Sequence, residues 1–431
     1  PDRPRAIHVT AFEIDPSMVA PLEESLAACA ALCRSRGVAF SSVLRREDFL
    51  STFESTSRPS WNTAILNPPY KKLRADSEHR RLLRRAGIET GNLYTAFLAL
   101  AARLLVPGGQ LVAITPRSFC SGPYFKPFRH DFLSRMTLRR VHVFDARDAV
   151  FGDDGVLQEN VVTHAIKGPA PQAATVTISS SSGLDFDAPM VREVPLPQVI
   201  RDDDPDRLIH IVPDAAGDLV TGTMARLRCS LDDLDVEVST GRVVEFRARV
   251  SLRARPGAGC APLVYPGHFA GGFVEWPRRI GRKPNAIAVA PATERLLLPA
   301  GDYTLVKRFS SKEEPRRVVA VVWDAARAPA SPIGFENHLN VFHRRGRGLP
   351  PALARGIALF LDSTLVDAWL RQWSGHTQVN AADLRRLRYP SLEQLVSLGE
   401  RVRDRFPAQP AIDHMVGHMV EAVLCQPPSP L

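Results

Sequence analysis

The sequence predicts a two-part α/β protein, in which a sheet of alternating strands and helices precedes a mixed α+β part. Short β-branched or aromatic runs alternate with helical patterns over residues 7–166, which is typical of an α/β sheet. From about residue 221 the chain becomes irregular and rich in Pro, Gly and Arg. A chain of 431 residues is long enough for more than one core. We therefore expect one domain over 1–220, including a linker, and a second over 221–431.

Six short apolar runs in the first part predict strands, namely 7–12, 38–43, 63–66, 111–114, 138–144 and 160–166. A helix is expected after the first run, because apolar residues from Val19 to Cys33 recur at helical spacing before Gly37. Residues 93–105 and 128–136 predict two more helices, and Pro107-Gly108-Gly109 predicts a turn. This alternation indicates a largely parallel sheet with helices on both faces.

In the second part, 318–323 is the clearest strand, and helices are expected over 351–373 and 392–406. The residues between about 168 and 220 are interpreted as the last elements of the first sheet and a linker.

The composition limits the classes of function. The net charge of +9 favours a polyanionic partner. There is no uncharged apolar run of about 18 residues and no signal-peptide pattern, so we expect a cytoplasmic protein without membrane contact. The six cysteines form no Cys-x-x-Cys pair and no His cluster has zinc spacing, so no metal is expected.

Asn67-Pro68-Pro69-Tyr70, after the run at 63–66, is the most specific chemical signal. The exocyclic amine of adenine is a poor nucleophile, because its lone pair is delocalised into the ring. The Asn67 side-chain oxygen and the Pro68 carbonyl can accept its two hydrogens and free that lone pair, and the prolines preset the carbonyl direction. Tyr70 offers a ring face for a base that has left the duplex. Considered alone, the tetrapeptide is equally consistent with a tight turn that has no catalytic role.

Two carboxylates follow the earlier strands. Glu13 comes after the run at 7–12, where an acidic side chain can accept hydrogen bonds from both ribose hydroxyls of a nucleoside. Asp48-Phe49 follows the next strand, where the carboxylate can accept from an adenine amine and the ring can pack on the base. Each alone is more simply a surface carboxylate. Because the carboxyl ends of such strands form ligand crevices, we expect Glu13, Asp48 and Asn67 to converge.

With these motifs in this order, the chain resembles the TaqI-type (gamma-group) adenine-N6 DNA methyltransferases of type II restriction–modification systems. The resemblance implies a Rossmann-like methyltransferase sheet followed by a target-recognition domain, with S-adenosyl-L-methionine as cofactor. It assigns catalysis to Asn67, Pro68, Pro69 and Tyr70, and cofactor binding to Glu13, Asp48 and Phe49. It extends to four segments of the second part, at 240–247, 306–313, 336–340 and 375–380.

The resemblance further implies methyl transfer to N6 of a flipped-out adenine in double-stranded DNA. It implies a monomer or weak dimer, with a cognate restriction endonuclease encoded nearby. The family's glycine-rich loop, which wraps the methionine half of the cofactor, precedes the strand that corresponds to 7–12. We therefore expect a sheet that is N-terminally incomplete, either because upstream residues are missing or because this copy is degenerate.

Three alternatives remain at this stage. An RNA methyltransferase and a protein-glutamine N-methyltransferase also use Asn-Pro-Pro-Tyr, because each acts on a planar, conjugated nitrogen. A catalytically degenerate DNA-binding remnant would explain the missing glycine-rich loop.

The second part also carries clustered cations, which suit phosphate contacts. The residues expected to bind DNA are Lys307, Arg308, Lys312, Arg316 and Arg317. A solvated surface would give the same pattern for any single arginine.

Overall fold

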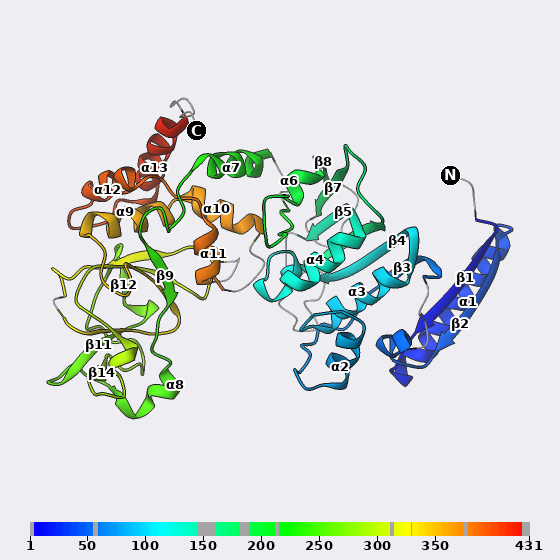
Figure 1. Cartoon of the computed structure of the whole chain (residues 1–431), viewed down its shortest axis with the longest axis horizontal. Helices are drawn as coiled ribbons and strands as arrows, with labels where there is room; N and C mark the ends of the chain where they lie inside the picture. The colour runs from blue at the N-terminus through cyan, green and yellow to red at the C-terminus, as the bar shows by residue number, and fades with distance from the viewer. Residues whose placement is uncertain are drawn as a thin grey trace. The chain divides into compact units, whose positions relative to one another are not determined.

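The structure of the chain is a computed structural model, which describes residues 4–54, 59–144, 160–181, 189–211, 215–310, 314–328, 330–373 and 378–424. The chain divides into two compact units, unit 1 (Pro1–Ile209) and unit 2 (His210–Leu431) (Figure 1). Across the described ranges, no helix combines the length and apolar character that a membrane crossing requires. Both units combine helices and strands, which confirms the fold class predicted from the sequence, α/β for the first part and mixed α+β for the second.

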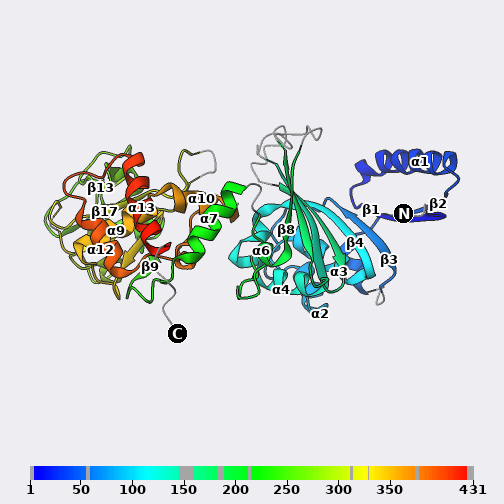
Figure 2. The same cartoon turned by 90° about the horizontal axis from the view of Figure 1, so that it is seen from above.

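Unit 1 begins with a strand–helix–strand motif. β1 (Ala6–Phe12) and β2 (Ala39–Arg45) pair in parallel, with Phe12 opposite Arg45. α1 (Val19–Ser35) connects them and lies along the pair (Figure 2). Asp15 Oδ1 accepts a hydrogen bond from Ser17 N at 2.9 Å and so starts the 3-10 turn Pro16–Met18 that leads into the helix. All three elements agree with the expected ranges.

The larger sheet of unit 1 has six strands. In spatial order they are β3 (Trp61–Leu66), β4 (Leu105–Pro116), β6 (Asn160–Lys167), β5 (Met136–Phe144), β7 (Thr175–Ser181) and β8 (Met190–Pro195). The β3–β4 and β5–β7 pairs are parallel, and the other three neighbouring pairs are antiparallel. The expectation of a largely parallel sheet was therefore wrong. Apolar periodicity identifies a buried strand but carries no information about its direction.

The glycines expected to form a turn lie inside β4. The register with β3 shifts there, since Trp61 faces Leu105 whereas Thr63 faces Gln110. Gly108 has a φ of 78°, a conformation that glycine adopts at little cost. The predicted turn is thus a bulge that lengthens β4 without ending it.

In the described part of unit 1, α3 (Leu93–Leu104) and α4 (Lys126–Arg135) pack on this sheet, and α2 (Glu78–Arg85) packs on the 3-10 turn Phe49–Glu54. α3 and α4 lie side by side over the sheet (Figure 1). α3 is almost entirely buried, as its apolar run predicts. The shorter α2 was not predicted, and its N-cap Ser77 accepts from Arg80 N.

The described residues of unit 2 form two sheets. The six-stranded sheet has the order β12 (Phe269–Ala270), β13 (Phe273–Val274), β17 (Ala320–Trp323), β16 (Tyr303–Lys307), β19 (Leu339–His343) and β9 (Glu237–Thr240). The five-stranded sheet has the order β10 (Leu252–Arg253), β14 (Ala286–Ala288), β11 (Cys260–Val264), β18 (Ile333–Phe335) and β15 (Leu297–Leu298). The short helix α6 (Leu196–Val199) follows β8 in unit 1, and α8 (Glu245–Ala248) lies in the chain between β9 and β10 of unit 2.

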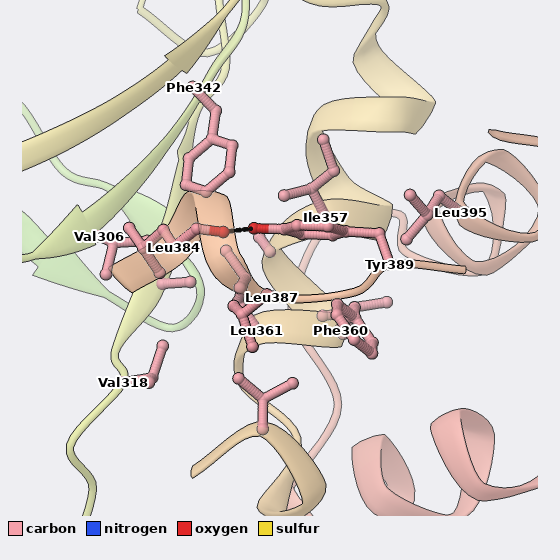
Figure 3. Close-up of a cluster of buried hydrophobic side chains, with 14 of the residues drawn as sticks. Val306, Val318, Phe342, Ile357, Phe360, Leu361, Leu384, Leu387, Tyr389 and Leu395 are labelled. Atoms are coloured by element: carbon pink, nitrogen blue, oxygen red, sulfur yellow. Dashed lines mark hydrogen bonds between the residues drawn. The ribbon is translucent and has the colours of Figure 1, made fainter. Parts of the chain in front are cut away.

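The other helices of unit 2 are α7 (Ala215–Arg226), α9 (Pro351–Leu361), α10 (Thr364–Trp373), α11 (Ala381–Arg386), α12 (Leu392–Glu400) and α13 (Gln409–Leu424). The helix expected over 351–373 is two helices, α9 and α10, separated at Asp362 and Ser363. Side chains from α9, β16 and β19 meet in one core around the buried Tyr389 (Figure 3). The Tyr389 hydroxyl donates to Leu384 O at 2.7 Å, so this polar group is satisfied inside the core.

Candidate active site

The Asn67-Pro68-Pro69-Tyr70 turn follows β3 directly. Because β3 and β4 are parallel, with Leu66 opposite Ala113, both strands end at the same edge of the sheet. The turn is closed by a hydrogen bond from Lys71 N to Pro69 O at 3.1 Å. The Tyr70 hydroxyl lies 3.4 Å from Ile114 O in β4, to which it donates. These contacts fix the turn against the neighbouring strand.

An aromatic pair supports the turn. Asn67 is exposed, Pro68 is buried and Tyr70 is half-buried. The Tyr70 ring lies edge-on to the buried Tyr94, with 6.2 Å between ring centres. Tyr94 is held in turn by a 2.9 Å hydrogen bond between its hydroxyl and Ser118 Oγ. Burial raises the pKa of Tyr70 to about 12, so its hydroxyl is neutral near pH 7.

The loop after β4 lies at this same edge and is rigidly held. The guanidinium of Arg129 is fully buried and donates to Phe119 O at 3.0 Å, Gly122 O at 2.7 Å and Asp206 O at 2.9 Å. Such charge-assisted bonds to carbonyls fix the backbone path. The loop presents Tyr124 with 87% of its surface exposed.

Asp48 follows β2 and has two partners. Its Oδ1 accepts from Leu50 N at 2.9 Å, and its Oδ2 lies 2.5 Å from Nε2 of His79 in α2. The next residue, Phe49, is 8% exposed and packs between Phe12 and Phe97, each at 5.2 Å between ring centres. The carboxylate is therefore oriented from both sides, while the ring beside it belongs to the core.

Glu13 follows β1 on the strand next to β2. Its backbone N–H donates to Arg45 O at 3.1 Å, which extends the β1–β2 pairing by one residue. Its Oε1 accepts from Asp15 N at 2.7 Å. Glu13 and Asp48 thus follow adjacent parallel strands and come off the same edge of the small sheet.

The predicted site residues fall into two groups. Within the described part of unit 1, Glu13 and Asp48 make no hydrogen bond or ion pair with residues 67–70. The small sheet is joined to β3 by a ring contact, since the centres of Phe12 and Trp61 are 6.4 Å apart. The structure therefore groups the two carboxylates on one sheet and the Asn-Pro-Pro-Tyr turn on the other.

The basic segment expected to bind DNA is largely engaged inside unit 2. Lys307 Nζ pairs with Glu314 at 2.5 Å, Arg308 Nη1 donates to Asn337 O at 3.1 Å and Arg316 Nη2 donates to Ser363 O at 3.0 Å. Arg317 is 1% exposed, so its guanidinium lies inside the unit and not on its surface. Lys312 lies outside the described residues.

The four segments of unit 2 that carry the family resemblance meet in one place. Val306 and Lys307 pair with Asn340 and Leu339 across β16 and β19. Residue 308 then joins two other segments, because its N–H donates to His338 O at 2.9 Å and its carbonyl accepts from Val379 N at 2.7 Å. The 240–247 segment is attached by a bond from Gly241 N to Leu339 O at 2.8 Å. Backbone hydrogen bonds therefore join the described parts of the four segments. Residues 311–313 and 375–377 are not among the described residues.

Sequence reasoning missed three residues of unit 1, namely His79, Arg129 and Tyr94. His79 lies 31 residues from Asp48 on a helix with few apolar residues, so nothing in its surroundings indicated a partner. Arg129 lies in a predicted helix, where an arginine is usually solvated. A signal was available for Tyr94 alone, since a tyrosine within an otherwise apolar helix usually needs a hydrogen-bond partner.

Comparisons with known proteins identify the family of the chain. A family model described as Eco57I restriction-modification methylase matches residues 40–151. The chain is 41% identical over 423 residues to the type II methyltransferase M.PstI of Providencia stuartii, covering 97% of this chain and 83% of that protein. It is 45% identical over 339 residues to the type II methyltransferase M.BsuBI of Bacillus subtilis, covering 79% and 67%.

Among solved structures, the type IIL restriction-modification enzyme MmeI, in complex with DNA, shares the fold. It matches over 91% of this chain and 58% of that chain, with a TM-score of 0.53 and 11% identity. On the strength of the two close relatives, the chain belongs to the type II methyltransferases of restriction–modification systems.

Proposed function

We propose that the chain transfers a methyl group from S-adenosyl-L-methionine to N6 of an adenine rotated out of duplex DNA, at a specific sequence. The observation that carries this proposal is the Asn67-Pro68-Pro69-Tyr70 turn at the carboxyl end of β3, with an exposed Asn67 beside a supported Tyr70 ring. In this proposal unit 1 performs the chemistry and unit 2 recognises the DNA. A monomeric cytoplasmic protein, encoded near a cognate restriction endonuclease, fits such a role.

The acceptor chemistry follows from the turn. Pro69 O is engaged by Lys71 N, so the Asn67 amide oxygen and the Pro68 carbonyl are the acceptors we assign to the two hydrogens of the adenine amine. Accepting both hydrogens localises the nitrogen lone pair, which makes the nitrogen nucleophilic. The base stacks on Tyr70, whose ring is backed by Tyr94. The nitrogen would bond to the methyl carbon as the carbon–sulfur bond of the cofactor breaks, which would leave a neutral thioether. The methylated nitrogen would then release a proton to solvent, so no strong general base is needed.

The two carboxylates fit a nucleoside cofactor. S-adenosyl-L-methionine, when bound, supplies the electrophilic methyl group. Glu13 and Asp48 leave adjacent strands at one edge, so the first can accept from ribose hydroxyls and the second from an adenine amine. Because Phe49 is buried, we assign it to holding Asp48 in place and not to an open ring face.

Methyl transfer to different acceptors tests the proposal. Labelled S-adenosyl-L-methionine is incubated with the protein and duplex DNA, structured RNA, or a protein bearing an exposed glutamine. We expect transfer to duplex DNA alone, and Asn67→Ala should abolish it while DNA binding is retained. Transfer confined to RNA or protein would refute the proposal in favour of the corresponding alternative. Full activity of Asn67→Ala would refute the assigned base site.

Cofactor binding is tested separately by isothermal titration of S-adenosyl-L-methionine into the chain. Micromolar affinity is expected if Glu13 and Asp48 hold the nucleoside. No binding, together with DNA binding, would favour the degenerate DNA-binding protein over the enzyme.

A further inference from the structure

A second group of basic residues in unit 2 is exposed throughout. It occupies two segments, 242–255 and 278–283, which we call the α8 surface. Its cations are Arg242, Arg247, Arg249, Arg253, Arg255, Arg278, Arg279, Arg282 and Lys283, and every one of them is exposed. Glu245 is the only carboxylate in the two segments. This differs from the basic segment at 307–317, whose described cations are half-buried or buried.

The two segments lie together in the fold. β10 pairs antiparallel with β14, so Arg253 faces Ala286, a few residues beyond the second segment. An ion pair between Lys283 and Glu245 joins the segments directly. Within unit 2, α8 lies at the end remote from α13 (Figure 1). The two basic segments are therefore neighbours in the fold of the unit.

Two large apolar side chains lie among these cations in the first segment. Phe246 is 70% exposed and Val250 is 88% exposed. They are four residues apart in a continuous run of helical turns, from α8 into the 3-10 turn Arg249–Ser251, which places them on one side. The guanidinium of Arg247 lies 5.4 Å from the centre of the Phe246 ring. An exposed apolar pair among cations combines the two kinds of group that meet a nucleic-acid groove and its phosphates.

The apolar pair is firmly anchored. Ala248, between the two exposed side chains, is buried in a cluster with Val243 and Leu263. The Arg253 guanidinium donates to Val250 O at 3.0 Å and to Leu252 O at 2.9 Å, which closes the turn. Phe246 and Val250 are thus held outward by an ordered backbone, and their exposure is built into the fold.

We propose that the α8 surface binds the DNA duplex, with Phe246 and Val250 entering a groove and the surrounding arginines on the phosphates of both strands. This inference rests on the proposed function. The chemistry of a groove matches the surface, because base edges and thymine methyls form its floor and phosphates its rims. The exposed guanidinium groups complement those phosphates. The 307–317 segment, whose described cations are engaged with other groups of unit 2, then supports the unit from within.

Equilibrium binding to a mixed-sequence duplex, measured by fluorescence anisotropy over a range of salt concentrations, tests the proposal. The double variant Arg247→Ala/Arg249→Ala is compared with Arg403→Ala/Arg405→Ala, which removes the same charge from exposed positions near α12. The first should weaken binding at least tenfold at low salt and reduce the salt slope by about 1.8, since each phosphate contact contributes about 0.9. The control should change neither quantity measurably.

Phe246→Ala is compared with Leu219→Ala, which truncates another exposed apolar residue of unit 2, 73% exposed on α7. Phe246→Ala should weaken binding about tenfold with the salt slope unchanged, because it removes an apolar groove contact and no charge. Leu219→Ala should bind as the wild type does. Circular dichroism confirms that each variant is folded.

The outcomes separate this inference from the proposed function. If the wild type methylates duplex DNA but the Arg247/Arg249 and Phe246 variants behave like their controls, the α8 surface is refuted and the function stands. If these variants lose DNA binding while the wild type shows no methyl transfer, the surface stands and the function fails. A wild type that binds an acidic protein but no duplex would refute the surface as a DNA site.

Discussion

Nε2 of His79 lies 2.5 Å from Oδ2 of Asp48, while the other oxygen of that carboxylate accepts from Leu50 N. The contact joins α2 to the end of β2 and fixes the direction of the carboxylate. A carboxylate that is already oriented loses little rotational freedom when it accepts a ligand hydrogen. His79 is therefore a positioning residue for the nucleoside site we propose around Asp48.

Replacing His79 by alanine should weaken cofactor binding. Loss of one hydrogen bond to a charged group corresponds to about 1.5 kcal/mol, or roughly a tenfold rise in Kd. Isothermal titration with S-adenosyl-L-methionine measures this change in Kd. The matched control is His130→Ala, which removes an exposed histidine whose side chain is hydrogen-bonded to Pro205 O, away from Asp48. Equal affinities for wild type and His79→Ala would show that Asp48 needs no orientation, or that it does not bind the cofactor.

The ring of Tyr70 should matter more than its hydroxyl. Tyr70→Phe removes only the long 3.4 Å bond to Ile114 O, so activity should stay within about threefold of the wild type. Tyr70→Ala removes the stacking face and should lower kcat/KM by about 10- to 100-fold. Because the pKa of Tyr70 is raised to about 12, the wild type and Tyr70→Phe should have parallel pH–rate profiles up to about pH 10. A wild-type profile that alone changes near pH 10 would contradict the assigned burial.

A buried carboxyl group in unit 2 should make stability depend on pH. Burial raises the pKa of Asp362 to about 7, from 3.8 in the unfolded chain. As the pH rises, the unfolded chain loses this proton before the folded chain does. The contribution of the carboxyl group to the free energy of unfolding is therefore fully present below about pH 4 and is lost as the pH rises to about 7. Within that interval, each rise of one pH unit lowers the free energy of unfolding by about 1.4 kcal/mol.

Asp362→Asn keeps an oxygen for Ala320 N, the 2.7 Å donor to this carboxyl group, and removes the titration. The free energy of unfolding of the wild type, relative to the variant, should fall between about pH 4 and pH 7. Urea unfolding at several pH values measures this difference. A difference that is constant with pH would contradict the raised pKa.

The contact between α9 and α12 depends on two glycines. A Cβ at Gly356 would lie 1.8 Å from Leu395 O, and a Cβ at Gly399 would lie 1.8 Å from Ala352 O. Gly356→Ala must therefore separate the helices, at a cost of about 3 kcal/mol. Gly222→Ala in α7 is the matched control, because its Cβ would meet nothing within 4 Å. That change should stabilise the helix by about 0.5–1 kcal/mol. Thermal unfolding compares the two, and equal melting temperatures would contradict the close helix contact.

Local patterns in the sequence predicted most of unit 1. The apolar runs at 7–12 and 63–66 became β1 and β3, and the helical spacing after Val19 became α1. Strand direction was not predictable, because β6 returns antiparallel between β4 and β5 and its residues do not record that reversal. The glycines of β4 were read as a turn, since a bulge and a turn require the same backbone freedom.

The candidate site was predictable where its residues are adjacent in the chain. Asn67 to Tyr70 carry a specific chemical pattern, and Glu13 and Asp48 each follow a strand. Their partners could not be predicted in the same way, because Tyr94 and His79 reach them only through tertiary packing. In unit 2, clustered cations indicated charge but not exposure, so the burial of Arg317 could not be predicted.

The most direct test of the proposed function is nucleoside analysis of duplex DNA after incubation with S-adenosyl-L-methionine and the protein. Mass spectrometry of the digested DNA distinguishes N6-methyladenine from methylated cytosines. We predict N6-methyladenine with the wild type and none with Asn67→Ala, at equal DNA binding. Methylation of cytosine, or N6-methyladenine at wild-type levels with Asn67→Ala, would contradict the role assigned to the Asn67-Pro68-Pro69-Tyr70 turn.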